Sequence, residues 1–573
     1  MLEKKWEVKP GLAESDFNHF PEINPIVLQL LFNRGLNVQQ NIDDFLNPEY
    51  EKNLSDPFLF TEMEKAVNQI LTAIENKEKI VVYGDYDADG VCSSALLVEL
   101  LRGLGGKPDV YIPYRETEGY GLNIEAVTEL AAKGTKLLIT VDCGVSNKTE
   151  IDLLNQKGVE VIVTDHHHQP KILPEAFAII NPNVEKETYP FRGLCGCGVA
   201  FKLAQAITKK QKDFKVNQLE TGFEKWLLDL VAIATIADMQ PLLAENRILV
   251  KYGLIVLQKT KRLGLLKLIE KMSNNLTVID ERVVGWQISP RLNAAGRLNH
   301  ASSAYQLLIT DQVEEAQKLA LELNQTNTQR QQLTEKITAA AKEILGSVKD
   351  QKFLAIVGTD WPTGIVGLVS GRITDEFNRP SLVISRYNGE IIGSGRSIPE
   401  FNIIEAIQKC DQYLTRYGGH GQAAGFTLKD EPSLELFIQA MTKLAEAELT
   451  GKDLKPILEI DAEIKLEQVN WELFEELAKF PPYGEGNPKP RFLAQNLTVA
   501  EMQTLGQDGK HLRLMVKHTT PIIRKTIGFC FGDWCAKLKV GDKVDMIFEV
   551  DVNEWNGNRE LQLKIVDLRI NKK

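Results

Sequence analysis

The 573-residue sequence has no long hydrophobic run and no low-complexity segment. No apolar stretch approaches the roughly 18 residues that suggest a membrane span. Residues 1–9 carry mixed charge and lack the apolar core of a signal peptide. We therefore expect a cytoplasmic protein with no membrane association. A chain of this length is too long for one hydrophobic core, so several domains are expected.

The chain also has few cysteines and no net positive charge. The seven cysteines are scattered and odd in number, which favours reduced thiols over a disulfide framework. Cys195 and Cys197 stand too close together for the usual metal-binding pair of cysteines. The net charge of −11 argues mildly against a simple nucleic-acid binder. An acidic exterior can nevertheless surround a locally basic groove, and bound divalent metals would add positive charge there.

The hydrophobic pattern predicts a parallel α/β domain. Residues 80–83, 137–141 and 159–163 are short, continuously apolar segments typical of buried strands. The intervening segments are helical in pattern, beginning with residues 92–104. Ligands of such sheets bind beyond the carboxyl ends of the strands.

The remaining pattern predicts further domains. Residues 313–345 read as one long polar helix, of the kind that often bridges two domains. A second α/β region follows, beginning with a strand at 353–357 and rich in glycine turns. After about residue 458 the strands are short and alternating, with examples at 512–516 and 544–550, which suits a small β-barrel.

Acidic and histidine residues follow all three strands of the first domain. They are Asp85, Asp87 and Asp89, then Asp142, then Asp165, His166 and His167. Carboxylates suit hard divalent cations, and His166 shifts the preference from Mg²⁺ towards Mn²⁺. Asp238 ends a long apolar run, where an unpartnered acid would be costly, so it is a further candidate ligand.

This constellation predicts metal-dependent phosphoester chemistry. Two metals about 4 Å apart generate a hydroxide and stabilise charge on a phosphoryl group. His167 would then contact the phosphate or assist proton transfer. Asp85 is equally interpreted as a helix cap or as support for the ligands. A calcium loop starting at Asp85 is excluded, because its twelfth position is Leu96 rather than glutamate.

Four motifs resemble the DHH phosphoesterase superfamily: residues 83–90 (YGDYDADG), 141–144 (VDCG), 165–167 (DHH) and 237–238 (AD). Along its whole length the chain resembles the RecJ family of single-strand-specific exonucleases. The resemblance implies two bound divalent ions, Mn²⁺ preferred and Mg²⁺ possible. It places their ligands at Asp87, Asp89, Asp142, His166 and Asp238. It assigns supporting or catalytic roles to Asp85, Asp165 and His167.

The resemblance also implies substrate-binding residues, which are Arg115, Tyr120, Arg291, Arg297, Ser394, Arg396, Gly419 and His420. Arg115 suits a phosphate through forked donation, and Tyr120 suits stacking on a base. Alternatively, Arg115 is solvated, Tyr120 packs in its loop, and the arginines of 290–297 (PRLNAAGR) pair with nearby acids. The glycines of 393–397 (GSGRS) and 418–426 (GGHGQAAGF) let backbone amides approach a phosphate.

With the resemblance, the expected fold class is a multi-domain α/β protein ending in an OB-fold barrel. The expected domains are an N-terminal leader with short helices (1–60), a DHH catalytic domain (61–311), a connecting helix (312–347), a DHH-associated domain (348–455) and an OB-fold nucleic-acid-binding domain (456–573). Pro362 stands where the family often has histidine, which puts a polar role there in doubt. His511, Arg513 and Lys517 are candidate DNA-binding residues of the barrel, and are equally interpreted as merely solvated. The barrel region also contains residues 482–488 (PYGEGNP).

These features together predict a processive 5′→3′ exonuclease on single-stranded DNA that releases mononucleotides by two-metal hydrolysis. By resemblance, it acts in DNA recombination and repair with single-strand-binding protein as partner. The two α/β domains joined by the long helix are expected to form a cleft for the strand. We expect a monomer, because this cleft needs no second chain. One alternative is a small-substrate DHH phosphodiesterase acting on oligoribonucleotides or cyclic dinucleotides. Another is a non-catalytic DNA-binding scaffold, although every ligand position is filled.

Overall fold

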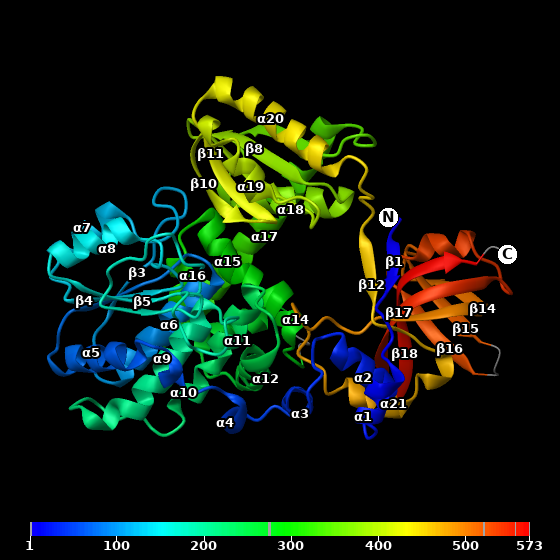
Figure 1. Ribbon diagram of the computed structural model, residues 1–573, viewed down its shortest axis with the longest axis horizontal. Coiled ribbons are helices and arrows are strands. Elements are labelled where there is room, and N and C mark those ends of the chain that lie inside the picture. Colours follow the sequence, from blue (N-terminus) through cyan, green and yellow to red (C-terminus); the bar gives the residue numbers. More distant parts are fainter. Residues whose placement is uncertain (1–2, 273–276, 519–521, 556, 572–573) are drawn as a thin grey trace.

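The computed structural model describes residues 3–272, 277–518, 522–555 and 557–571. Figure 1 shows two α/β domains, one above the other, and a β-barrel beside them that packs with the N-terminal segment. Within the described ranges, no helix is both long and apolar enough to cross a membrane.

The sheet of the first domain is entirely parallel, in the order β3-β2-β4-β5-β6. Its strands are β2 (Ile80–Tyr83), β3 (Asp109–Tyr111), β4 (Leu137–Val141), β5 (Glu160–Thr164) and β6 (Ala178–Ile180). Val82 and Ile139 join one hydrophobic cluster, whereas Val81 and Leu138 join another on the opposite face. The predicted parallel sheet, covered on both faces, is confirmed, and the three predicted strands match β2, β4 and β5.

Helices cover this sheet and extend the domain below it. They are α5 (Met63–Glu75), α6 (Ala88–Gly103), α7 (Ile124–Ala132), α8 (Lys148–Gln156), α9 (Gly196–Lys210), α10 (Phe223–Trp226), α11 (Leu228–Ala237), α12 (Ala244–Gln258), α13 (Leu263–Met272), α14 (Glu281–Val283), the π-helical turn η3 (Val284–Ile288), α15 (Ser289–Leu298) and α16 (Ser302–Ile309). The mean hydropathy of α11 is high, and almost all of its residues are buried. It therefore forms the centre of the helical part.

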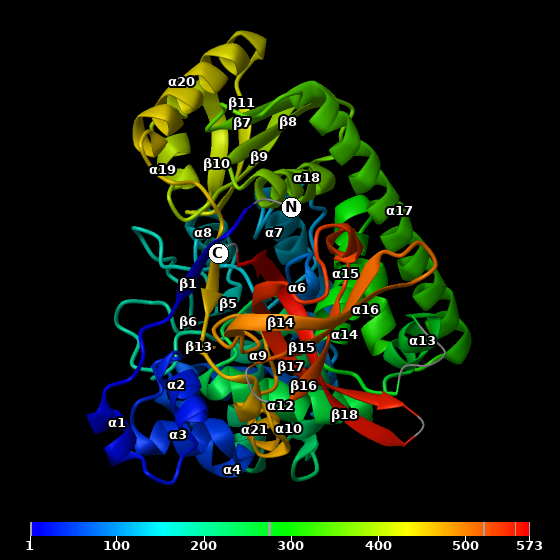
Figure 2. The same ribbon diagram turned by 90° about the vertical axis from the view of Figure 1, so that its right-hand side faces the viewer.

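The predicted bridging helix is confirmed as α17 (Val313–Leu345), 33 residues long. Figure 2 shows it running from α13 of the first domain to the second domain. The second sheet has the order β10-β11-β9-β8-β7, in which only β7 and β8 are parallel. Its elements are β7 (Leu354–Thr359), α18 (Thr363–Phe377), β8 (Ser381–Tyr387), β9 (Glu390–Arg396), α19 (Ile403–Gln408), β10 (Leu414–His420), β11 (Ala423–Leu428) and α20 (Glu431–Leu449).

The C-terminal strands form the predicted barrel. Neighbouring strands pair in the order β14-β15-β16-β18-β17, and a further β14–β17 pairing closes the barrel. The elements are β12 (Ile457–Ile460), β13 (Ala462–Glu463), α21 (Trp471–Leu477), β14 (Phe492–Leu505), β15 (His511–Lys517), β16 (Ile523–Gly528), β17 (Lys543–Trp555) and β18 (Asn558–Ile570). Because the barrel is closed, each of its five strands, β14 to β18, is paired on both sides.

The N-terminal segment packs against the barrel rather than against the first domain alone. Its short helices are as predicted: α1 (Glu14–His19), α2 (Pro25–Phe32), α3 (Gln39–Leu46) and α4 (Tyr50–Asn53). Leu28 and Phe45 share a hydrophobic cluster with Leu514 and Phe548 of the barrel. In addition, β1 (Lys5–Val8) pairs in parallel with β12, which joins the second domain to the barrel. Figure 1 shows these two strands side by side.

Candidate metal centre

The metal centre begins where β2 turns into α6. The Asp87 carboxylate caps α6, accepting hydrogen bonds from the backbone amides of Asp89 (2.9 Å) and Gly90 (3.0 Å). Because of this cap, α6 begins at Ala88 rather than at the predicted residue 92. Asp89 therefore lies in the first helical turn, not before the helix as the predicted start at residue 92 implied. Gly90 is required here, since a Cβ would lie 2.6 Å from the Asp85 backbone nitrogen.

Asp89 is held by the start of a second helix. Its two carboxylate oxygens accept hydrogen bonds from the backbone amides of Gly196 and Cys197, both at 2.7 Å. These amides begin α9, where the helix dipole favours a negative group. A Cβ on Gly196 would lie 2.5 Å from the Cβ of Asp142, so glycine allows the close approach. Cys195 and Cys197 themselves belong to no metal-capable group among the described residues.

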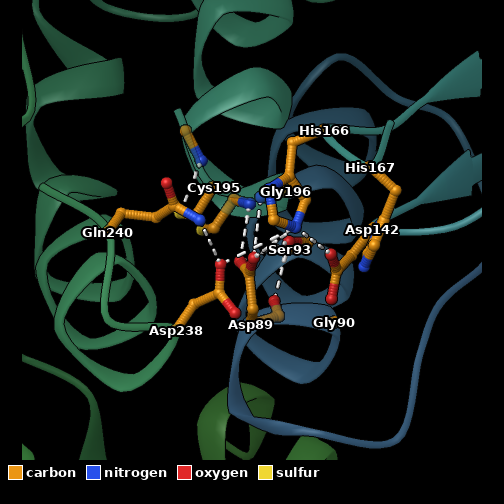
Figure 3. Close-up of polar contacts among 12 residues, drawn as sticks. Asp89, Gly90, Ser93, Asp142, His166, His167, Cys195, Gly196, Asp238 and Gln240 are labelled. Carbon is orange, nitrogen blue, oxygen red and sulfur yellow. Dashed lines mark hydrogen bonds and ion pairs between the residues drawn. The ribbon is translucent and has the colours of Figure 1, made fainter. Parts of the chain in front are cut away.

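His166 lies among three aspartates of the site (Figure 3). Its Nε2 is 3.1 Å from Asp142 Oδ1, 3.7 Å from Asp238 Oδ2 and 3.9 Å from Asp89 Oδ2. Burial lowers the pKa of His166 to about 3, so the ring is neutral and available as a ligand. Asp142 has a φ of 61°, a left-handed conformation that aspartate tolerates better than most residues and that is often found at functional sites.

Three groups of side chains lie close enough together to share an ion. The first contains Asp89, His166 and Asp238, the second contains Asp85, Asp87 and Asp142, and the third contains Asp142, His166 and His167. His166 Nε2 and Asp142 Oδ1, one from each of the first two groups, lie 3.1 Å apart, so these two groups are adjacent. Asp85 is therefore close enough to be a ligand of an ion, in addition to the supporting role that the sequence suggested.

The donor set fits divalent cations. The buried oxygens Asp85 Oδ1 and Asp142 Oδ1 accept no hydrogen bond from any residue that the structure describes. Burial, together with the charges of neighbouring carboxylates, raises the pKa of Asp85, Asp89 and Asp142 well above the ordinary range. Uncompensated buried carboxylates are costly, and a cation would remove that cost.

His167 is held beside the ligands. Its Nδ1 lies 2.8 Å from Asp165 Oδ1, which also accepts from the backbone amides of His166 and His167. Burial lowers the pKa of His167, but the Asp165 hydrogen bond and charge outweigh it and raise the value to about 9. The Tyr120 hydroxyl donates to the Asp142 carbonyl (3.0 Å) and lies 2.9 Å from His167 Nδ1. The stacking of Tyr120 on a base stays a prediction.

Arginines gather next to this centre. Burial and the neighbouring guanidinium groups of Arg115 and Arg330 lower the pKa of Arg297 to about 9. Arg396 adds to the same repulsion and donates to Ser394 Oγ at 2.9 Å. None of these four arginines forms an ion pair with a carboxylate in the described ranges. The sequence did not predict a role for Arg330 on α17, whose Nε is buried and makes no hydrogen bond within the described residues. The charge of Asp87 offsets only part of the repulsion at Arg297, and a positive cluster of this kind suits a polyanion.

The arginine motif 290–297 has a second role that the sequence did not reveal. The Asn293 side chain accepts from the Ala88 amide at 2.8 Å, at the start of α6. A Cβ on Gly296 would lie 2.4 Å from the Tyr86 carbonyl oxygen. This motif therefore braces the metal-binding loop. Arg291 donates to Asn324 of α17 and to the Gln287 carbonyl of the π-helical turn η3, so both of these contacts are within the protein.

Residues of the second domain approach the metal centre from the opposite side. His420, at the end of β10, has its ring 6.0 Å from that of His168, which follows the two site histidines. Gly419 has a φ of 144° and packs against the Ala423 carbonyl, where a Cβ would lie at 2.3 Å. The substrate contacts expected of Gly419, His420, Ser394 and Arg396 stay predictions.

Comparison with known proteins supports the domain pattern. Three family models match: the DHH family N-terminal domain over residues 79–235, the DHHA1 domain over 350–447 and the RecJ OB domain over 460–567. The single-stranded-DNA-specific exonuclease RecJ of Bacillus subtilis is 36% identical over 96% of this chain and 68% of its own length. RecJ of Haemophilus influenzae is 33% identical over 90% of this chain and 92% of its own length.

A solved structure of Thermus thermophilus RecJ with Mn²⁺ superposes with a TM-score of 0.84 at 29% identity, covering 99% of this chain and 80% of that one. The same protein with Mg²⁺ gives 0.77 at 27% identity, covering 99% and 79%. Both the sequence and the fold therefore agree over nearly the whole chain. The chain belongs to the RecJ family of the DHH proteins.

Proposed function

We propose that this protein is a metal-dependent exonuclease that degrades single-stranded DNA from its 5′ end and releases mononucleotides. The observation that carries the proposal is an acid–histidine metal centre directly beside a cluster of arginines that form no ion pair in the described part of the chain. The curated relatives are single-stranded-DNA-specific exonucleases by name, which supports the same substrate.

Two divalent cations are proposed, with Mn²⁺ preferred. Asp87 and Asp142, with Asp85 beside them, would hold one cation, and Asp89, His166 and Asp238 would hold the other. When bound, such cations supply an activated water nucleophile and neutralise charge on the phosphoryl group. The imidazole of His166 favours Mn²⁺ over Mg²⁺.

The chain's own residues orient the strand and move protons. Asp165 fixes the ring of His167 beside the carboxylates, where it can contact a phosphate oxygen or transfer a proton. Arg115 stacks on the Tyr86 ring at 4.9 Å, at the edge of the metal-binding loop. We propose that Arg115, Ser394 and Arg396 hold the terminal 5′ phosphate. That contact would set the polarity of digestion.

The closed barrel would bind the strand away from the active centre, as OB folds do. We further propose action in DNA recombination and repair, with single-strand-binding protein as a partner. A cytoplasmic location and a monomeric state belong to the same proposal.

The test compares substrates in the presence of Mn²⁺. Single-stranded and duplex DNA, single-stranded RNA and dinucleotides are each incubated with the full-length protein. The proposal expects mononucleotides from single-stranded DNA at a rate far above that for the other substrates. Preference for RNA dinucleotides would instead support a small-substrate phosphodiesterase, and no hydrolysis of any substrate would support a DNA-binding scaffold.

A further inference from the structure

A loop of the C-terminal domain contacts the segment that follows Asp238. This is the 481–488 loop, which lies between α21 and the first barrel strand. The Leu242 amide donates to the Glu485 carbonyl at 2.8 Å. A Cβ on Gly484 would lie 2.8 Å from Leu242 Cδ1, and one on Gly486 would lie 3.2 Å from Pro241. The two segments therefore pack with their backbones in close approach, which the two glycines allow.

The contacted segment, residues 239–243, fixes the position of Asp238. Helix α11 ends at Ala237 with Asp238 as its C-cap, and Met239 reverses the chain with a φ of 54°. The Gln240 amide then donates back to the Thr235 carbonyl at 3.1 Å. The Gln240 side chain donates to Asp238 Oδ2 at 2.8 Å, as Figure 3 shows. A shift of this segment would thus move a carboxylate oxygen that lies 3.7 Å from His166 Nε2.

The 481–488 loop is itself rigidly braced. Asn487 is fully buried, and its side-chain amide donates to the carbonyls of Phe480 (2.9 Å) and Pro482 (2.8 Å). Its Oδ1 accepts from Arg34 Nε at 2.7 Å, which ties the loop to the turn that follows α2. Buried amides with all partners satisfied specify a single conformation.

A second brace joins three separate parts of the chain. Arg247, on α12 of the first domain, is 1% exposed. Its guanidinium donates to the carbonyls of Phe45 (2.9 Å), Lys479 (2.6 Å) and Phe480 (2.6 Å). The first carbonyl belongs to the N-terminal segment, and the other two belong to the residues directly before the 481–488 loop. The C-terminal domain is therefore fastened to the first domain within a few residues of the metal centre.

We propose that the 481–488 loop is a positioning element of the metal centre. Through Leu242 and Gln240 it holds Asp238 in place, so that cation affinity at the Asp89, His166 and Asp238 group depends on the docked C-terminal domain. The importance of this coupling for catalysis rests on the proposed function, but its effect on metal binding does not require DNA. Changes to groups that orient metal ligands typically cost 10–100-fold in affinity or activity.

The main test is Asn487→Asp in the full-length protein. Aspartate preserves the size and the acceptor towards Arg34, but it loses both donations and places a carboxylate against two carbonyls. Mn²⁺ binding is measured by calorimetry and by the spin resonance of free Mn²⁺, without DNA. We expect the affinity of one bound ion to fall about 10–100-fold. Oligonucleotide affinity in EDTA should stay within about twofold.

A second variant approaches the contact from the other side. Leu242→Ala removes the side chain that meets Gly484 and leaves the barrel untouched, and it should also weaken Mn²⁺ binding. Leu268→Ala is the matched control, because it removes an equally buried leucine from α13, which packs against α16 and α17. It should leave the Mn²⁺ affinity of the folded protein unchanged. Circular dichroism and thermal melting establish that each variant is folded.

Unchanged Mn²⁺ affinity in both Asn487→Asp and Leu242→Ala would overturn the proposal. Weakened oligonucleotide binding with normal Mn²⁺ affinity would also overturn it, because the loop would then serve DNA alone. If the wild-type protein binds Mn²⁺ but does not cut single-stranded DNA, the proposed exonuclease function fails. The Mn²⁺ titrations of the variants would still decide the role of the loop.

Discussion

Replacing Asp238 by asparagine should stabilise the metal-free protein and reduce the further stabilisation that Mn²⁺ provides. Burial, followed by the charge of Asp87, raises the pKa of Asp238 from 3.8 to about 6. A folded-state pKa above the unfolded value means that ionisation opposes folding. This cost is absent below about pH 4, grows between pH 4 and 6, and is complete at pH 7.

The size of the cost follows from the pKa difference. About two pKa units correspond to about 3 kcal/mol. The side chain is 26% exposed, so solvent screening reduces this to about 1–3 kcal/mol. Asparagine still accepts the hydrogen bond from Gln240 but carries no charge. In EDTA at pH 7, Asp238→Asn should therefore melt several degrees above the wild type.

Mn²⁺ should stabilise the wild type more than the variant. At a concentration 100 times its dissociation constant, a cation stabilises the folded protein by about 2.7 kcal/mol. A variant with 100-fold weaker binding gains only about 0.4 kcal/mol under the same conditions. The difference of about 2.3 kcal/mol offsets most or all of the variant's advantage in EDTA. The assay is differential scanning calorimetry in EDTA and in Mn²⁺. The control is Asp213→Asn, which removes the same charge from an exposed position and should gain as much stability from Mn²⁺ as the wild type. A lower melting temperature of Asp238→Asn in EDTA would refute the reasoning.

Three further predictions follow from the site. His167→Ala should lower kcat by about 10²–10⁴-fold with little change in Mn²⁺ affinity, measured by single-turnover kinetics and metal titration; full activity would exclude a role for this ring. Arg396→Gln should raise KM about 10–100-fold for strands with a 5′ phosphate, because a charged hydrogen bond contributes about 1.5–3 kcal/mol, and an equal loss for strands ending in a hydroxyl would contradict phosphate recognition. Arg330→Met should reduce the salt dependence of single-strand binding by about 0.7 in the slope of log K against log salt, and an unchanged slope would remove Arg330 from the DNA path.

The sequence predicts those features whose signal is local. The strands at 80–83 and 137–141 and the long helix α17 follow from the period of apolar residues, and the structure confirms them. The sequence also predicts that the acids and histidines form one site, because each of them follows a parallel strand or ends a helix of the first domain. The start of α6 was placed too late, because Asp87 serves as a helix cap as well as a candidate ligand.

Other features depend on contacts that no local pattern encodes. The amides of Gly196 and Cys197 hold Asp89 through their backbone, so the identity of their side chains gives no indication of it. Arg330 on a polar helix looks like any solvated arginine until Arg297 is seen beside it. The pairing of β1 with β12 joins segments from opposite ends of the chain. Only the folded structure brings such residues together.

The most direct test of the central claim follows one single-stranded oligonucleotide in Mn²⁺, labelled at its 5′ end in one sample and at its 3′ end in another. The wild-type protein should release the 5′ label at once as a mononucleotide, while the 3′ label passes through progressively shorter strands. Asp142→Asn, which keeps a residue that tolerates the left-handed backbone, should release neither label. Early release of the 3′ label by the wild type, or full activity of Asp142→Asn, would contradict a 5′→3′ exonuclease built on this metal centre.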